Sequence, residues 1–290
     1  MDNNVIASPS DELLVNRNIK DSVFRNLFSD KKYLFQLYQA LHPEDKETTI
    51  DDLEYVTLEN VLVRDIYNDL GVRIGDKLLL LIEAQSTWTE NIIIRCLLYM
   101  ARTLQDYLKS TSQSLFSEKL VHVPEPELYV IYTGDSVIEK EYISLSETFF
   151  EGKQTALDVR VKVVVDGKEG DIINQYVVFT KVINDQVKIY GRTREAITEA
   201  IRICKNRNIL KDYLTSREKE VVDIMITLFD QQEVLEDYIA SEVREQTEKK
   251  DKQTAKMLYD AGVPVETIAN SLKRSIRIIE KWLGLVPQAY

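Results

Sequence analysis

The strongest constraint on the fold is an unbroken aliphatic run at residues 78–82, which ends directly against Glu83. A strand with one face in water alternates apolar and polar residues, and this run has no such alternation. The run therefore predicts a central strand that is covered on both faces. Glu83 and Gln85 come at its end, and because they are two residues apart, their side chains leave the same face of the strand.

Length, hydropathy and charge narrow the class of protein. A chain of 290 residues can fold as one large domain or two smaller ones. No apolar run approaches the roughly 20 residues of a membrane span, and the first residues lack the pattern of a secretory signal. We therefore expect a soluble, cytoplasmic protein without a membrane partner. The formal net charge of −11 argues against a surface that is cationic throughout, as in general nucleic-acid binders.

Cysteine and histidine usage argues against a zinc site. The two cysteines, Cys96 and Cys204, lie far apart and each falls in a helical pattern, which predicts buried, reduced thiols. The two histidines, His42 and His122, are also distant from each other and have no cysteine close by in sequence. A cluster of nitrogen and sulfur ligands is therefore not expected.

Periodicity predicts an α/β order of elements rather than a doubly wound sheet. The expected elements, in chain order, are a helix over about 22–41, a weak strand at 57–63, a β-hairpin at 66–74 and 77–85, a helix at 90–110, and strands within 127–134 and 156–167. Asp21 or Ser22 would cap the first helix and Thr89 the second. From residue 170 onward nearly every segment has helical period.

The turn of this hairpin decides whether Asp69 lies near Glu83. A two-residue loop at 75–76 puts Asn68 opposite Glu83, whereas a three-residue loop at 75–77 puts Asp69 there. Opposed residues share a face, with Cβ atoms about 5 Å apart. Gly71 also permits a bulge that would re-aim Asp69. The sequence leaves these arrangements open.

Two carboxylates that close to each other repel unless a cation lies between them. Mg²⁺ is the natural candidate, with Mn²⁺ or Ca²⁺ as alternatives, because hard cations prefer carboxylate oxygens. A bound ion would polarise a phosphoryl oxygen and lower the pKa of a bound water, which Gln85 could orient. The plainer interpretation places Asp69 in a turn and leaves Glu83 and Gln85 at the exposed end of a strand.

A wider stretch supports the first interpretation. Residues 68–103, NDLGVRIGDKLLLLIEAQSTWTENIIIRCLLYMART, resemble the core of the PD-(D/E)XK nuclease superfamily, and within it the Rpn family of recombination-promoting nucleases and transposases. The similarity extends from about residue 21 to 229. It implies a restriction-endonuclease-like αβββαβ core, with Asp69, Glu83 and Gln85 as the catalytic motif of an Mg²⁺-dependent DNA endonuclease. In that motif Asp69 and Glu83 would be the metal ligands.

The sequence departs from the superfamily at the lysine of its motif, where Gln85 stands. This substitution is usual in the Rpn family, but it leaves the positive partner of the water unassigned. Lys77 lies at the hairpin turn, far from Glu83 along the strand, so Arg95 is the better candidate for a phosphate or transition-state contact. An i,i+4 surface pair or a stack on Tyr99 is an equally good interpretation of Arg95.

The C-terminal stretch resembles a helix-turn-helix unit with breaks at 262–264 and near 273–275. The apolar positions that could close a three-helix core are Ile268, Ala269, Leu272, Ile276, Ile279 and Trp282. The basic residues near the expected recognition helix, which would contact DNA, are Lys273, Arg274, Arg277 and Lys281. A helical hairpin that joins copies of the chain is an equal alternative, since the second turn lacks the common glycine.

A second basic stretch lies upstream. Residues 192–219 carry eight basic residues against four acidic ones. Such a run usually marks a solvated helix face. A site for a polyanion would require the basic stretches to converge in space.

These observations together predict an α/β protein with four regions. They are a flexible arm at 1–18, a PD-(D/E)XK nuclease-like core at 19–187, a helical extension at 188–252, and a helix-turn-helix-like or oligomerisation segment at 253–290. The expected activity is metal-dependent hydrolysis of DNA phosphodiester bonds, linked to recombination or transposition. The alternative is a catalytically weak or inactive protein that keeps the fold and binds DNA or forms homo-oligomers.

Overall fold

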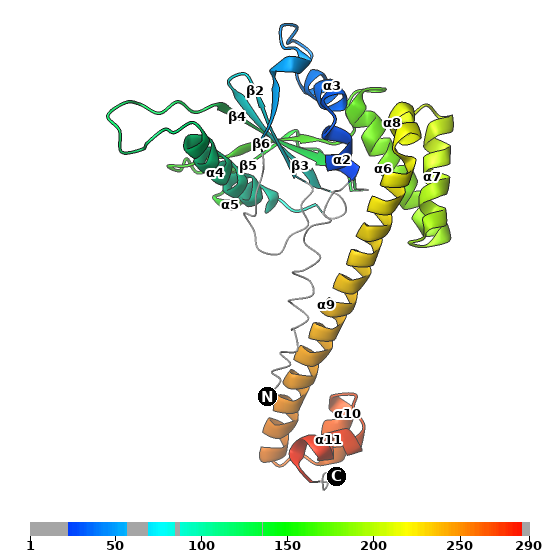
Figure 1. Cartoon of the computed structure of the whole chain (residues 1–290). Helices are drawn as coiled ribbons and strands as arrows, with labels where there is room; N and C mark the ends of the chain where they lie inside the picture. Colours follow the sequence, from blue (N-terminus) through cyan, green and yellow to red (C-terminus); the bar gives the residue numbers. More distant parts are fainter. Residues whose placement is uncertain (1–22, 57–68, 85–87, 135, 286–290) are drawn as a thin grey trace, which may run out of the picture. The chain divides into compact units, whose positions relative to one another are not determined.

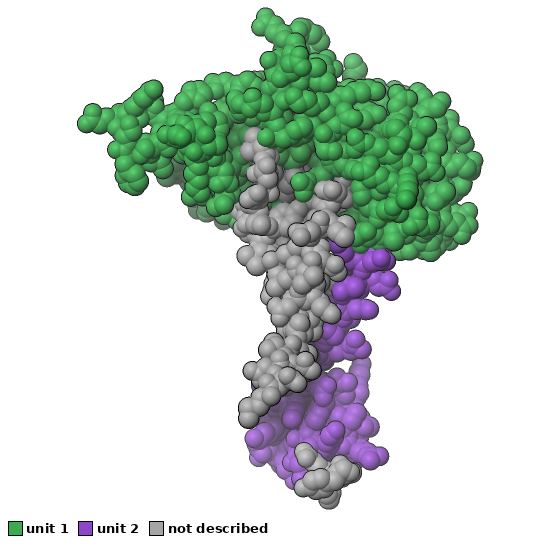
Figure 2. Space-filling view, viewed as in Figure 1, with its two compact units in different colours: residues 1–228 green, residues 229–290 purple. Residues whose placement is uncertain are grey.

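A mixed β-sheet surrounded by helices leads into a helical C-terminal region (Figure 1). The computed structural model describes residues 23–56, 69–84, 88–134 and 136–285. The chain divides into two compact units, Met1–Leu228 and Phe229–Tyr290 (Figure 2). The boundary between the units falls inside the region at 188–252 that the sequence predicts as one helical extension. The predicted arm at 1–18 lies outside the described residues.

Six strands form one sheet in the order β1-β2-β3-β4-β6-β5. The strands are Leu53–Val56 (β1), Asp69–Ile74 (β2), Lys77–Ala84 (β3), Glu125–Tyr132 (β4), Tyr142–Ser144 (β5) and Arg160–Val164 (β6). The first three pair antiparallel in turn, β4 is parallel to both β3 and β6, and β5 is antiparallel to β6. This sheet and its helices confirm the mixed α/β class.

β3 is the central strand that its aliphatic run predicts. Residues 78–81 are each 1% exposed, so both faces of the strand are covered. Figure 1 places α4 (Ile92–Ser110) on one side of the sheet, and α2 (Val23–Phe28), α3 (Lys31–Leu41) and α6 (Ile172–Tyr190) on the other. On the α4 side, Leu78 and Leu80 belong to one hydrophobic cluster with Ile93 and Cys96.

The predicted first helix is in fact two helices. α2 ends at Phe28 and α3 begins at Lys31, because the carboxylate of Asp30 accepts a hydrogen bond from the backbone N–H of Lys32 and so caps a new helix. The predicted caps Asp21 and Ser22 lie outside the described residues.

Two further predictions about elements need correction. The three-residue strand β5 was not expected from the sequence. The N-cap position of α4 is Asn91 instead of Thr89, and the Asn91 side chain makes no capping hydrogen bond. The Thr89 hydroxyl accepts a hydrogen bond from the Asn91 backbone N–H, just before the helix. The strand candidate at 57–63 lies outside the described residues, and β1 directly precedes it.

Three further helices belong to the first unit: α5 (Leu145–Phe149), α7 (Arg194–Asn206) and α8 (Lys211–Ser216). A 3₁₀ turn at Ile50–Asp52 precedes β1. The α4 residue Cys96 and the α7 residue Cys204 are both reduced and fully buried, as predicted. Burial raises the pKa of the Cys204 thiol to about 11, so this group stays protonated at neutral pH.

α9 runs without a break from Glu218 to Asp260 and crosses from the first unit into the second. The sequence predicts a charged helix only to about residue 250. Residues 218–260 contain neither glycine nor proline, so nothing local ends the helix earlier. α10 (Val265–Ser271) and α11 (Ile276–Leu283) follow. Among the described residues, no helix is long and apolar enough to cross a membrane.

Candidate functional site

Two of the three predicted catalytic residues, Asp69 and Glu83, lie at one end of the β2–β3 hairpin. Asp69 is the first residue of β2, and Glu83 is the last residue but one of β3. For these two residues only the backbone is described, and Gln85 lies outside the described residues altogether. The strand and register of Asp69 and Glu83 are therefore known. The side-chain geometry of all three residues stays a prediction.

The register follows the two-residue loop. Ile74 pairs with Lys77, and the pairing continues one to one until Asp69 lies opposite Ile82. Gly75 closes the turn with φ of +56°, a value that glycine adopts without strain. The three-residue loop, with Asp69 opposite Glu83, is not the arrangement found, and the regular ladder contains no bulge at Gly71. Asp69 and Glu83 thus sit on adjacent strands, offset by one residue.

Glu83 lies near the carboxyl ends of neighbouring parallel strands. Glu83 pairs with Ile131 of β4, and β4 in turn pairs in parallel with β6. In open α/β sheets, ligands bind at this edge because the connecting loops and helix starts gather there. Beneath the edge, Trp88 packs edge-on against the fully buried ring of Tyr132, at a centroid distance of 5.5 Å. The Tyr132 hydroxyl accepts a hydrogen bond from the Ser136 backbone N–H.

A polar cluster just before α4 was not predicted. One oxygen of Glu90 accepts a hydrogen bond from Lys140 at 2.8 Å, and its other oxygen accepts one from the Thr148 hydroxyl at 2.5 Å. The hydrogen bond from Lys140, followed by that from Thr148, lowers the pKa of Glu90. These partners are distant in sequence from Glu90, so no local motif could have indicated them. The cluster ties the loop after β4 and helix α5 to the start of α4.

Arg95 lies on α4 and stacks on Tyr99, which is one of the two plain interpretations of this residue from the sequence. Its guanidinium carbon is 5.9 Å from the ring centroid of Tyr99, which is buried. The Arg95 side chain is itself half-buried. A role for Arg95 on phosphate stays a prediction.

A second polar cluster joins the opposite, amino ends of β3 and β4. Glu127 accepts hydrogen bonds from His42 Nε2 at 2.8 Å and from the Tyr129 hydroxyl at 2.8 Å, and it pairs with Lys77 at 3.2 Å. Burial opposes the charge on Glu127, but the hydrogen bonds from His42 and Tyr129 outweigh it and lower its pKa to about 2. Burial and the Glu127 carboxylate raise the pKa of Tyr129. Lys77 is therefore engaged away from Glu83, as predicted.

This cluster should make the free energy of unfolding depend on pH in the acid range. The folded pKa of Glu127 is below its unfolded value of 4.5, so its contribution is fully present above pH 4.5 and is lost as the pH falls toward about 2. We expect Glu127→Gln to lower the free energy of unfolding at pH 7 by about 1–2 kcal/mol and to flatten its decline over that acid window. Urea unfolding at several pH values measures both effects. An unchanged pH dependence would contradict the assignment.

Part of the basic stretch at 192–219 is neutralised within the first unit. Arg194 pairs with Asp223 at 3.2 Å, Arg202 with Glu199 at 2.6 Å, and Lys205 with Glu218 at 2.9 Å. The first and third of these pairs join α7 to α9, and the second lies within α7. These three basic residues offer little free positive charge to a polyanion.

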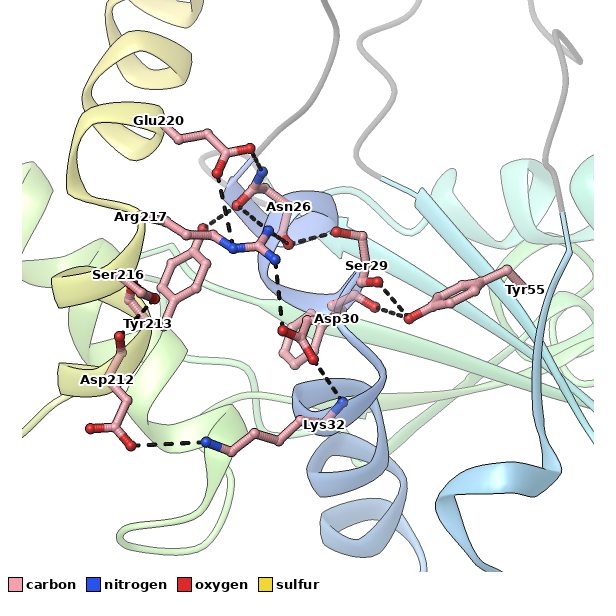
Figure 3. A network of polar contacts seen from close by, with 11 residues as sticks. Asn26, Ser29, Asp30, Lys32, Tyr55, Asp212, Tyr213, Ser216, Arg217 and Glu220 are labelled. Carbon is pink, nitrogen blue, oxygen red and sulfur yellow. Dashed lines mark hydrogen bonds and ion pairs between the residues drawn. The ribbon is translucent and has the colours of Figure 1, made fainter.

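Arg217, in the same stretch, belongs to a network that fastens α2 to α8 and α9 (Figure 3). The buried Asn26 accepts a hydrogen bond from the Tyr213 hydroxyl at 2.8 Å and donates one to Glu220 at 2.8 Å. Arg217 reaches Asp30 at 3.6 Å and Glu220 at 3.9 Å. The network joins segments from both ends of the first unit.

The four basic residues predicted to contact DNA from the C-terminal unit differ from one another in exposure and in partners. Lys273, Arg277 and Lys281 are exposed. Arg274 is partly buried and pairs with Asp251 of α9, with its Nε 3.0 Å and its terminal nitrogen 2.9 Å from the same carboxylate oxygen. Arg274 is thus a structural residue of this unit, and the other three remain candidates for contact.

Within the described residues, no group of three or more His, Cys, Asp or Glu side chains could hold a metal ion. The side chains of Asp69 and Glu83 are not part of that set. Comparison of the chain with protein-family models, curated proteins and solved structures gives no match. The resemblance to the Rpn family therefore rests on the motif and on the order of elements.

Proposed function

We propose that this chain hydrolyses phosphodiester bonds in DNA, with a divalent metal ion held by Asp69 and Glu83. The observation that carries the proposal is the position of Glu83 near the carboxyl end of β3, beside the parallel strand β4. This edge of an α/β sheet is where ligands bind. The carboxylate of Glu83 comes directly after the buried aliphatic run of β3, at a position where it could bind a cation.

The order of elements also supports the proposal. α3, β1, β2, β3, α4 and β4 follow one another in the chain, which is the αβββαβ order of restriction-endonuclease-like cores. The carboxylate oxygens of Asp69 and Glu83 are the donors that Mg²⁺ prefers. When bound, the ion would supply Lewis-acid stabilisation of the phosphate and a more acidic water. The amide of Gln85 would orient that water, and it has no basic group with which to take its proton.

The hairpin register favours a second candidate function. Because Asp69 lies opposite Ile82, regular alternation gives it the face of residue 82 rather than that of Glu83. Asp69 is, however, the first residue of β2, and the hydrogen-bonded pairing that makes successive side chains alternate between the two faces ends there. If the two carboxylates do not meet, the chain would be a DNA-binding protein that keeps this fold and does not cleave.

Plasmid nicking by the purified full-length protein separates these candidates. We expect conversion of supercoiled to open-circular DNA in Mg²⁺ and none in EDTA. Binding without nicking in Mg²⁺ and in Mn²⁺ would contradict the nuclease and favour the second candidate. The result also decides whether the missing motif lysine is dispensable.

A further inference from the structure

Charge is distributed unevenly along the chain. Residues 249–285 contain eight Lys and Arg against four Asp and Glu, in a protein whose formal net charge is −11. This segment includes the end of α9, all of α10 and all of α11. A compact positive region in an acidic chain is the electrostatic pattern of a nucleic-acid contact.

The segment folds around a small core of its own. Ala255, Ile268 and Ile279 are fully buried, and they come from α9, α10 and α11 respectively. Ala269 is buried, and Leu272 and Trp282 pack against the same cluster, as the sequence predicts. Ile276 does not join the core and is 44% exposed. The three helices therefore form a defined unit, in which α10 and α11 are joined by a short turn.

The turn is held by contacts that fix the direction of α11. Lys273 takes a left-handed conformation with φ of +52°, so the chain turns here without glycine. Arg274 binds Asp251 of α9 and stacks over Trp282, 6.0 Å from its ring centroid. The Ser275 hydroxyl caps α11 by accepting a hydrogen bond from Ile278. These contacts connect all three helices through the turn.

The outer face of α11 carries exposed positive charge. Arg277 and Lys281 are four residues apart, so they lie one turn apart on the same side of the helix. The buried Ile279 points to the other side, and both basic side chains are exposed. Exposed Ile276 and Ile278 flank them, 44% and 39% accessible.

We propose that this C-terminal unit, residues 249–285, binds double-stranded DNA by placing α11 in the major groove. The helix of 8 residues is about 12 Å long, close to the width of that groove. Arg277 and Lys281 contact DNA from the exposed face, and Lys273 contacts phosphate at the turn. Arg274 makes no DNA contact and holds α11 in place. The binding is independent of the cleavage proposed above.

The test measures DNA affinity where cleavage does not run. Full-length protein is titrated onto a fluorescein-labelled duplex in EDTA, at several KCl concentrations, with anisotropy as the readout. Arg277→Gln with Lys281→Gln should weaken binding about tenfold or more and lower the slope of log affinity against log salt by about 1–2. Both sites are exposed, so the circular dichroism spectrum should not change.

A charge-matched variant in the first unit provides the control. Lys46→Gln with Lys119→Gln removes two exposed positive charges and should leave affinity and salt slope close to wild type. Light scattering without DNA reports the mass of each protein. If the α11 variant binds DNA with unchanged affinity and slope, the proposal is overturned. A smaller assembly for that variant would then make the surface a contact between copies.

Discussion

Glu83→Gln and Asp69→Asn should each lower the rate of plasmid nicking in Mg²⁺ about 100-fold or more. A catalytic metal ion supplies several kcal/mol of charge stabilisation in the transition state, and each 1.4 kcal/mol or so corresponds to a factor of ten in rate. Loss of one of two carboxylate ligands removes much of that stabilisation. The measurement is the initial rate of open-circle formation by full-length protein at equal concentrations.

Asp76→Asn is the matched control for these variants. Asp76 lies in the turn of the same hairpin, at the end opposite Glu83, and its exposed side chain contacts only His122 in the described structure. Removal of this carboxylate should leave nicking within about twofold of wild type, as expected for a surface change. Full activity in both Glu83→Gln and Asp69→Asn would place the chemistry elsewhere.

Asn26→Ala should lower the free energy of unfolding by about 2–4 kcal/mol. Asn26 is 7% exposed and satisfies the buried Tyr213 hydroxyl, Glu220 and, more weakly, Arg217. Its loss leaves the buried Tyr213 hydroxyl without its partner, which costs about 1–3 kcal/mol. It also removes the hydrogen bonds to Glu220 and Arg217, which keep their ion pair with each other. Thermal and urea unfolding measure the effect. Asn184→Ala, at an exposed position of α6, should change stability by less than about 0.5 kcal/mol.

A double-mutant cycle tests the partner assignment. Tyr213→Phe removes the hydroxyl that Asn26 satisfies. Because both variants break the same contact, the loss in the double variant should be smaller than the sum of the single losses. Additive losses would mean that Asn26 stabilises the helices by another route.

Sequence patterns predict elements whose signal is local and strong. The aliphatic run at 78–82 identifies β3. The helical pattern also identifies α9, but its end is predicted at about residue 250, ten residues before the helix ends at Asp260. The division at Asp30 was missed because one apolar stripe continues through both helices while a single side-chain cap starts the second. β5 was missed because three residues are too few to establish an alternation.

The sites depend on information that short sequence windows lack. The hairpin register depends on one residue in the turn, and that choice decides whether Asp69 lies opposite Glu83 or Ile82. The Glu90 cluster joins residues that are far apart in sequence. Arg274 was expected on DNA because it lies in a basic run, yet the acidic partner that engages it comes from α9. Composition indicates the charge of a region, and only the fold shows which charges are already paired.

The proposed site requires one divalent ion shared by Asp69 and Glu83, and calorimetric titration of Mn²⁺ into the full-length protein measures the binding of that ion. Two carboxylates close together favour a cation between them, and the removal of either ligand weakens that site. We predict one Mn²⁺ site in the wild-type protein and in Asp76→Asn, and its loss in both Asp69→Asn and Glu83→Gln. A site that persists in either of those two variants with wild-type affinity would contradict the shared ion.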